Sequence, residues 1–170
     1  MIMPSTEHYD FHEALSALQK CIRRGLEEDA VIFAMELEAF NKTALWNRLK
    51  VIASEDIGPA NPASVLLVAE LEKQYQKAGL DESRLLFLVN AVVCLCRSHK
   101  SRIAVDLLNV VLLEKKIPKM PSFALDMHTV RGKTKGRGWN HFFTEGTKLC
   151  NEKFENPYKE RHRKLREKKA

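Results

Sequence analysis

Apolar residues recur every three or four positions along most of the first 115 residues, which is the spacing of one face of an α-helix. Leu15, Leu18 and Ile22 follow this spacing behind Asp10, a residue type that caps helix N-termini. By the same criterion, the pattern predicts helices over residues 11–26, 29–40, 44–54, 63–78, 82–97 and 101–115. Strand-like alternation of β-branched residues is scarce, so the predicted fold class is all-α, a helical bundle.

The stretch 49–62 interrupts this pattern between the third and fourth predicted helices. Gly58 and Pro59 do not continue a helix comfortably, whereas Asn61 can cap the next helix and Pro62 suits its first position. We therefore expect a sharp corner here.

Two acidic residues, Glu55 and Asp56, stand at the end of the third predicted helix, just before this corner. Negative charge is unfavourable there, because the C-terminal end of a helix carries partial negative charge. We interpret both as structural or interface carboxylates, paired with Arg48, with another basic side chain or with a neighbouring subunit. Solvated carboxylates are the alternative.

The predicted helices 82–97 and 101–115 are apolar around most of their circumference. Such a helix is either central in a bundle or covered by another subunit, because exposing it would promote aggregation. Two consecutive helices of this kind favour self-association.

Two prolines within residues 116–122 end the helical pattern, because proline favours extended backbone. We predict a helical domain over residues 1–116. The segment 117–170 is predicted to hold a proline linker, a basic glycine-rich loop, a short helix and a basic tail.

The net charge of +6 is unevenly distributed. From Arg131 to the end there are 13 Lys and Arg against 5 Glu, whereas the preceding 130 residues carry 15 basic and 17 acidic groups. A nearly neutral body with a basic appendage is common in chains that bind nucleic acid or an acidic protein. A tail that only keeps the protein in solution is the alternative.

Targeting and metal-binding signals are weak in this sequence. It has no 18-residue apolar run and no signal-peptide pattern, so we expect a cytoplasmic (intracellular) protein without membrane contact. Its four cysteines form no CxxC pair and are interpreted as free thiols rather than zinc ligands.

The basic appendage contains the candidate nucleic-acid-binding residues. Its glycines allow main-chain N–H groups close to an anion, and Trp139 can either stack on a base or anchor the short helix on the bundle. The predicted contacts go mainly to phosphates and are independent of sequence. The candidates are Arg131, Lys133, Lys135, Arg137, Trp139, Arg161, Arg163 and Lys164.

Gly132-Lys133-Thr134 resembles the end of a phosphate-binding P-loop, but the required spacing is absent. Position 127, where that motif needs a glycine, is Met, and no apolar strand precedes it. We therefore predict no nucleotide binding and no cofactor.

One group of residues could support metal binding or acid–base chemistry. His141 and Glu145 are four positions apart, hence on one helix face, and Asp126 with His128 could face them across the basic loop. The alternative is a structural network, in which His128 hydrogen-bonds the loop and Glu145 pairs with an arginine.

Several segments resemble a known family. They are Ser16-Ala-Leu-Gln-Lys-Cys-Ile-Arg23, Glu28-Asp-Ala, Arg48-Leu-Lys-Val-Ile-Ala-Ser-Glu-Asp-Ile-Gly-Pro-Ala-Asn-Pro62 and Leu95-Cys-Arg-Ser-His-Lys-Ser101. They are similar to the C-terminal region of the replication-associated recombination protein A family (RarA, also called MgsA), relatives of the Werner helicase interacting protein. The resemblance extends from Glu13 to Leu113, with His99 where the family more often has proline.

The resemblance implies an all-helical domain similar to a clamp-loader collar, which assembles subunits into a tetramer. It also implies work at stalled or damaged replication forks, with DNA and single-stranded DNA-binding protein as partners. In that family an ATPase module precedes this region. Only 12 residues precede the resemblance here, so we expect no ATPase module.

These observations lead to one preferred interpretation and two alternatives. We expect a non-catalytic oligomerisation and nucleic-acid-binding module associated with DNA replication, recombination and repair. The alternatives are a small metal-dependent enzyme acting on nucleic acid, and an adaptor that docks onto a RarA-like ATPase.

Overall fold

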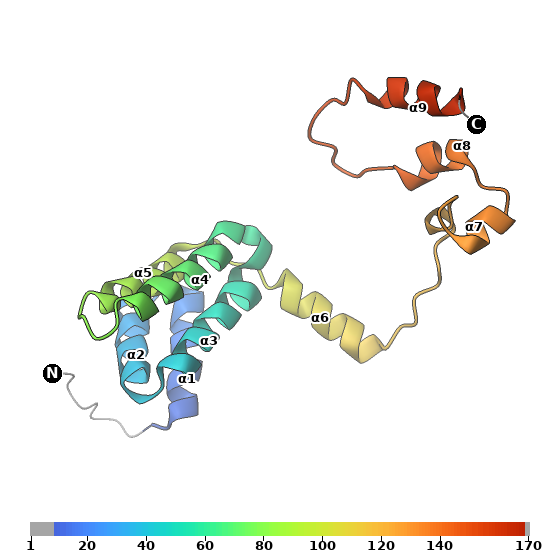
Figure 1. Cartoon of the computed structure of the whole chain (residues 1–170). Helices are drawn as coiled ribbons and strands as arrows, with labels where there is room; N and C mark the ends of the chain where they lie inside the picture. The colour runs from blue at the N-terminus through green and yellow to red at the C-terminus, as the bar shows by residue number, and fades with distance from the viewer. Residues whose placement is uncertain (1–8, 169–170) are drawn as a thin grey trace. The chain divides into compact units, whose positions relative to one another are not determined.

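The computed structural model describes residues 9–168, which form helices joined by turns and extended segments (Figure 1). No strand occurs in this part of the chain, which confirms the predicted all-α class. The α-helices are α1 (Phe11–Arg24), α2 (Glu27–Phe40), α3 (Lys42–Ile52), α4 (Pro62–Lys77), α5 (Arg84–Arg97), α6 (Ile103–Glu114), α7 (Val130–Thr134), α8 (Trp139–His141) and α9 (Lys159–Glu167).

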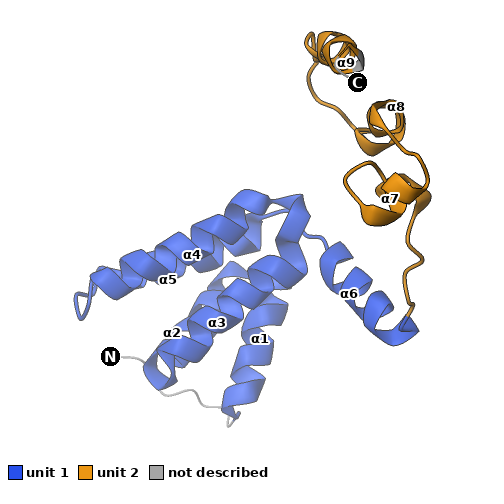
Figure 2. Cartoon of the chain, turned by 45° about the vertical axis from the view of Figure 1, so that its right-hand side comes forward, with its two compact units in different colours: residues 1–115 blue, residues 116–170 orange. Residues whose placement is uncertain are grey.

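The chain divides into two compact units, residues 1–115 and 116–170 (Figure 2). α6 ends at Glu114, and the following residue, Lys115, adopts the left-handed conformation that commonly terminates helices. Pro118 and Pro121 follow in the connecting segment.

Helix α1 begins at Phe11 behind Asp10, as predicted, and ends at Arg24, two residues before the predicted end. The Asp10 carboxylate accepts hydrogen bonds from the backbone N–H groups of His12 and Glu13, and the Glu13 side chain accepts from the Asp10 N–H. This is a complete capping box. At the other end Gly25 has a φ of 74°, a conformation that glycine adopts without steric cost.

The core of the first unit is built around α5. Helix α5 packs against α1, α2, α3 and α4, and it buries Leu88, Val92 and Leu95 completely. Apolar faces of the surrounding helices close the core, through Leu18 and Ile22 of α1 among others. Of the two apolar helices in the sequence, α5 is therefore the central one.

The corner between α3 and α4 is a π-helical turn, Ala53–Ile57, followed by a 3₁₀ turn, Gly58–Ala60. Pro62 is the first residue of α4, as predicted. The predicted side-chain cap by Asn61 is wrong: its Nδ2 instead donates to Ser98 Oγ at 3.2 Å. Ser98, which is distant in the sequence, therefore binds the Asn61 side chain that the local sequence pattern predicted as the cap of α4.

Glu38 of α2 is a buried carboxylate that links α2 to three other helices. It accepts a hydrogen bond from Tyr75 Oη at 2.6 Å and pairs with Arg84 Nη2 at 3.2 Å and Lys42 Nζ at 3.5 Å. Burial alone would raise the pKa of Glu38, but the hydrogen bonds from Tyr75 and Arg84 outweigh it, so the pKa lies below its ordinary value.

Helix α6 differs from the other helices of the first unit. None of its residues, all within the described part of the chain, is buried, although nearly all are apolar. It packs against the two turns of the corner. Figure 1 shows it leading away from the bundle formed by α1 to α5.

The second unit consists of short elements: a 3₁₀ turn (Ser122–Ala124), α7, α8 continuing into a π turn (Phe142–Gly146), and α9. Considering both units, no helix formed by residues 9–168 has the length and apolarity needed to cross a bilayer.

We expect Tyr75→Phe to lower the free energy of unfolding at pH 7 by about 1.5–3 kcal/mol, because it removes a hydrogen bond to a buried charged group. A group with a lowered folded-state pKa contributes stability above its unfolded pKa, and this contribution is lost as pH falls through the folded pKa. The difference in the free energy of unfolding between Tyr75→Phe and the unmodified protein should therefore become smaller below about pH 4.5. Urea unfolding followed by circular dichroism at several pH values measures it, and a difference that stays constant down to pH 3 would contradict the assignment.

Candidate functional site

The corner holds the most deeply buried charge of the first unit. The π turn directs Asp56 inward, where its side chain is 0% exposed. Arg23 of α1 donates from Nε to Asp56 Oδ1 at 2.8 Å and from Nη2 to Oδ2 at 3.2 Å. This bidentate pairing supplies the compensation that a buried carboxylate requires.

Two further groups complete the environment of Asp56. Arg102, just before α6, donates from Nη1 to Asp56 Oδ1 at 3.2 Å and to Glu55 Oε1 at 2.9 Å. Gln19 donates from Nε2 to Asp56 Oδ2 at 3.0 Å. Arg23 also lies 3.4 Å from Glu55, so two arginines and two carboxylates form one cluster.

The direct pairing of Arg48 with these carboxylates, which the sequence suggested, does not occur. Arg48 donates to Gln19 Oε1 at 3.0 Å and so orients the amide that contacts Asp56. Sequence reasoning missed Arg23 as the main partner. The signal was present in α1, where Gln19 and Arg23 are four positions apart and therefore on one face of the helix.

The same cluster fixes where α6 begins. The Ser101 N–H donates to the Asp56 carbonyl at 2.8 Å, beside the contacts of Arg102. Lys100 Nζ donates to the carbonyls of Leu95, Cys96 and Ser98 at 2.7–2.9 Å, and burial lowers its pKa. The Glu55–Asp56 pair is thus engaged by structural partners on both sides.

In the second unit, the basic loop is organised by α7. Thr129 caps this short helix, accepting the Gly132 N–H at 3.0 Å through its hydroxyl. Gly132 packs on the backbone of Asp126, and a Cβ there would lie 1.8 Å from the Asp126 carbonyl oxygen. Its N–H group is therefore not available to an anion, contrary to the sequence expectation.

The four cations of the loop fall into two groups. Arg137 donates to the carbonyls of Ser122 and Leu125 and to Ser122 Oγ, and so ties the loop to the preceding segment. Arg131, Lys133 and Lys135 are exposed, and within residues 9–168 none of them forms an ion pair with a carboxylate. The predicted binding role thus fits these three better than Arg137.

The tail cations lie on α9. Arg161 and Lys164 are exposed, and Arg163 is half-buried with Nη2 3.4 Å from Asn140 Oδ1. Arg166 of the same helix lies over Trp139, 4.6 Å from the ring centroid, within the range of a cation–π interaction.

Trp139 belongs to an aromatic cluster inside the second unit. It stacks on Phe143 at 5.8 Å and meets Phe142 edge-on at 5.6 Å. His128 and His162 extend the cluster through Phe142 and Phe143 respectively. These contacts connect α8 with α9, so Trp139 has a packing role within this unit; its contact with bases stays a prediction.

Two of the candidate acid–base residues, Asp126 and His128, pair with each other, and Glu145 pairs elsewhere. Asp126 accepts from the His128 backbone N–H at 2.9 Å, which lowers the pKa of Asp126, and from His128 Nδ1 at 3.2 Å. Glu145 pairs with Lys148 rather than with an arginine, at 3.7 Å. Among residues 9–168 no three His, Cys, Asp or Glu side chains gather as a metal site would require.

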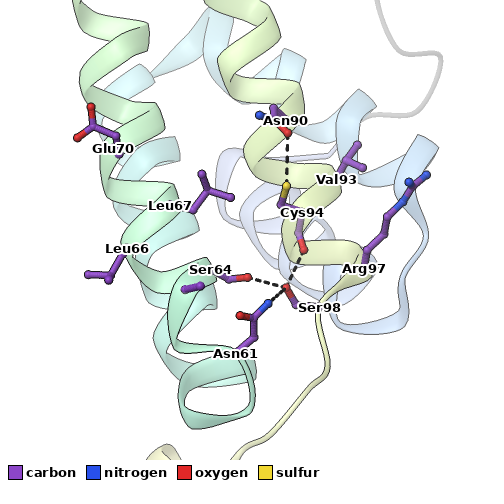
Figure 3. Close-up of a pocket in the computed structure, with 11 residues that line it drawn as sticks. Asn61, Ser64, Leu66, Leu67, Glu70, Asn90, Val93, Cys94, Arg97 and Ser98 are labelled. Atoms are coloured by element: carbon purple, nitrogen blue, oxygen red, sulfur yellow. Dashed lines mark hydrogen bonds between the residues drawn. The ribbon is translucent and has the colours of Figure 1, made fainter.

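The sequence did not reveal a groove that lies between α4 and α5 in the first unit (Figure 3). Its volume is about 800 Å³. Leu66 and Leu67 of α4 and Val93 of α5 are among its apolar walls. At one end Ser64 and Ser98 share a hydrogen bond of 2.7 Å.

Comparisons with known proteins extend the resemblance noted in the sequence. Residues 27–165 match the sequence model of the family described as MgsA AAA+ ATPase C terminal. Replication-associated recombination protein A of Bacillus subtilis (strain 168) is 36% identical to the chain over 136 residues. That alignment covers 77% of this chain and 31% of the relative, so the chain spans less than a third of the relative's length.

The extent of the match corrects one expectation. The resemblance was predicted to end at Leu113, with the basic appendage outside it, whereas the family match continues to residue 165. It includes α7, α8 and most of α9. The basic unit is therefore part of the same family region as the helical bundle.

The arginine cluster leads to a stability prediction with a matched control. Arg23→Met should lower the free energy of unfolding by about 3 kcal/mol, because it leaves the buried Asp56 carboxylate with incomplete compensation. Arg24→Met removes the same charge from the same helix turn. Arg24 is exposed, and among residues 9–168 the one hydrogen bond of its side chain goes to the Lys20 carbonyl. This variant should therefore lower the free energy of unfolding by less than about 1 kcal/mol. Equal costs for the two variants in urea unfolding would contradict the central role of the cluster.

Proposed function

The chain belongs to the family of MgsA AAA+ ATPase C-terminal regions, and from this premise we propose that it is a non-catalytic module that self-associates and binds nucleic acid. The name of the B. subtilis relative associates that protein with replication and recombination. We place the module in the same processes, DNA replication, recombination and repair.

The observation that carries the proposal is the exposed apolar surface of α6. Seven of its large apolar side chains are exposed: Ile103, Leu107, Leu108, Val110, Val111, Leu112 and Leu113. Soluble domains rarely expose a contiguous apolar surface of this kind unless a partner covers it. A second copy of the chain supplies such a partner.

A binding role is also supported by the state of the acidic residues. Asp56 and Glu55 are held by arginines, and Glu38 is held by Tyr75 and Arg84. Carboxylates committed in this way stabilise the fold. The family match supports the same conclusion, since it is to the region C-terminal to an ATPase.

Nucleic-acid binding is supported by three exposed cations of the basic loop, Arg131, Lys133 and Lys135, which have no carboxylate partner among residues 9–168. They lie within five positions, and Arg161 and Lys164 on α9 add exposed positive charge to the same unit. Cations without internal partners can neutralise phosphates at little desolvation cost. Single-stranded and double-stranded nucleic acid both fit this electrostatic mode of binding.

A second candidate is an adaptor that assembles with a RarA-like ATPase or with single-stranded DNA-binding protein. The observation that favours the ATPase is the shared family region, since a full-length relative carries corresponding helices. Mixed assembly with such an ATPase would then use the same apolar surface as self-association. The assembly expected from the family resemblance is a tetramer.

Self-association should appear as a mass that rises with concentration. In size-exclusion chromatography with light scattering between about 1 and 100 µM, we expect the mass to exceed the 19.5 kDa of one chain. A constant mass of one chain over this range would contradict self-association. Repeating the series with single-stranded DNA shows whether nucleic acid changes the assembly.

Nucleic-acid binding is tested by a triple variant, Arg131→Ala with Lys133→Ala and Lys135→Ala. Its affinity for a single-stranded oligonucleotide in fluorescence anisotropy at low salt should fall at least about tenfold, and the slope of log K against log salt should decrease by about 2. Arg137 is kept, because it holds the loop together.

The matched control removes three positive charges from the first unit: Lys20→Ala, Lys73→Ala and Lys77→Ala. Its affinity and salt slope should change little if the basic loop is the binding site. Equal losses in both triple variants would indicate attraction by net charge alone, and unchanged affinity in the loop variant would refute the proposed site.

A further inference from the structure

Helix α6 has two sides with different surroundings. Val105 and Leu108 line a hollow of about 470 Å³ against Lys50 and Val51 of α3. Another side carries Ile103, Leu107, Val110 and Val111, spaced i, i+4, i+7 and i+8, and lines no part of that hollow. This is the spacing of an apolar stripe that packs on a neighbour, yet its residues are 47–62% exposed.

The groove between α4 and α5 is suited to an apolar guest. Its serine and asparagine groups are already hydrogen-bonded: Ser64 and Asn61 contact Ser98 Oγ, which donates to the Cys94 carbonyl at 2.8 Å. At its rim, Arg97 is paired with Glu27 at 2.7 Å. Leu66 is 74% exposed, so the groove offers uncovered apolar surface and few free polar groups.

The dimensions of the helix and the groove agree. Helix α6 has 12 residues and is about 18 Å long. The groove is lined from Asn61 to Glu70 on one wall and from Asn90 to Ser98 on the other, or about 12–14 Å of helix. It therefore accommodates two to three turns, which is the length of the apolar stripe.

The α6 of the same chain is held away from this groove. Residues 98–102 connect α5 to α6, and Ser101, Arg102 and Lys100 anchor this connection to the corner and to the end of α5. These contacts set α6 against the corner turns. A guest helix must therefore come from another copy.

We infer that the apolar stripe of α6 packs into the α4–α5 groove of a second copy, an inference that rests on the proposed self-association. The contact area favours a reciprocal exchange. Half the lateral surface of a cylinder about 18 Å long and about 10 Å wide is roughly 280 Å². One helix in one groove buries roughly 560 Å², below the size of a specific interface, whereas two reciprocal contacts bury roughly 1,100 Å².

Reciprocal packing also closes the assembly. Each copy donates one helix and one groove, so a two-fold axis satisfies both surfaces and leaves no free stripe. A one-way contact would leave a stripe and a groove open at the ends and extend into a filament, unless its rotation closed a ring.

Disulfide cross-linking tests the contact, because the native Cys94 lines the groove. The parent background carries Cys21→Ser and Cys150→Ser. Cys96 is retained, since it lies in the core, where burial raises its pKa to about 11. Leu107→Cys adds a thiol to the stripe, and mild oxidation should give a two-chain product on non-reducing gels.

The cross-linking control is Leu113→Cys in the same background. Leu113 is exposed but lies near Asp106 and Asn109, on the polar edge of α6. It should give little product. A single-chain disulfide with Leu107→Cys, or equal two-chain products from both variants, would overturn the inference.

A negative charge introduced into the groove or the stripe tests this contact separately from self-association in general. Leu66→Glu in the groove and Leu107→Glu on the stripe should each raise the dissociation constant of the assembly at least about tenfold in sedimentation equilibrium. Leu80→Glu, in the exposed turn between α4 and α5, should leave it unchanged. All three positions are exposed, so the fold should be retained, which circular dichroism verifies.

The two proposals fail in different ways. A chain that stays monomeric at all concentrations refutes both. A chain that assembles normally with Leu66→Glu and Leu107→Glu, and gives no Cys94 cross-link, retains the proposed self-association but refutes the α4–α5 groove as its site.

Discussion

The buried carboxylate of Asp56 is the constraint on which the first unit depends. A charge withdrawn from water requires nearby opposite charge and hydrogen bonds, and Arg23, Arg102 and Gln19 supply them from α1 and from the segment before α6. Because these partners come from distant parts of the sequence, compensating one carboxylate joins the first helix to the corner. It also determines where the last helix of the unit begins.

This arrangement gives the two apolar helices different roles. Helix α5 lies among α1 to α4 and provides much of the core, whereas α6 starts at the arginine cluster and presents its apolar side chains outward. The exposed surface is therefore a consequence of how the corner is built. Because the arginine cluster holds α6 in a defined position, α6 loses little conformational freedom when a partner binds. It therefore presents a defined binding surface.

The positive charges of the second unit fall into two groups. Some contact partners within the unit, and others have no carboxylate partner among the described residues. Arg137 and Arg166 contact carbonyl groups and an aromatic ring, and they hold the short helices together. Arg131, Lys133 and Lys135 have no carboxylate partner among the described residues and remain available to a ligand. The family match includes most of this unit together with α2 to α6 of the bundle, so the basic residues lie in the same family region.

The all-α class, the approximate helix ranges, the N-cap of α1, the charge asymmetry and the family could all be inferred from the sequence. These features depend on neighbours within about four residues, or on composition, and are legible without the fold. The tertiary structure alone decided that Arg23 and Arg102 rather than Arg48 pair with Asp56, that α5 rather than α6 is central, and that Asn61 contacts Ser98 instead of capping α4. The hydrogen bonds of Asp56 and Asn61 join residues 33 to 46 positions apart, and only the packing of whole helices brings such groups within hydrogen-bond distance.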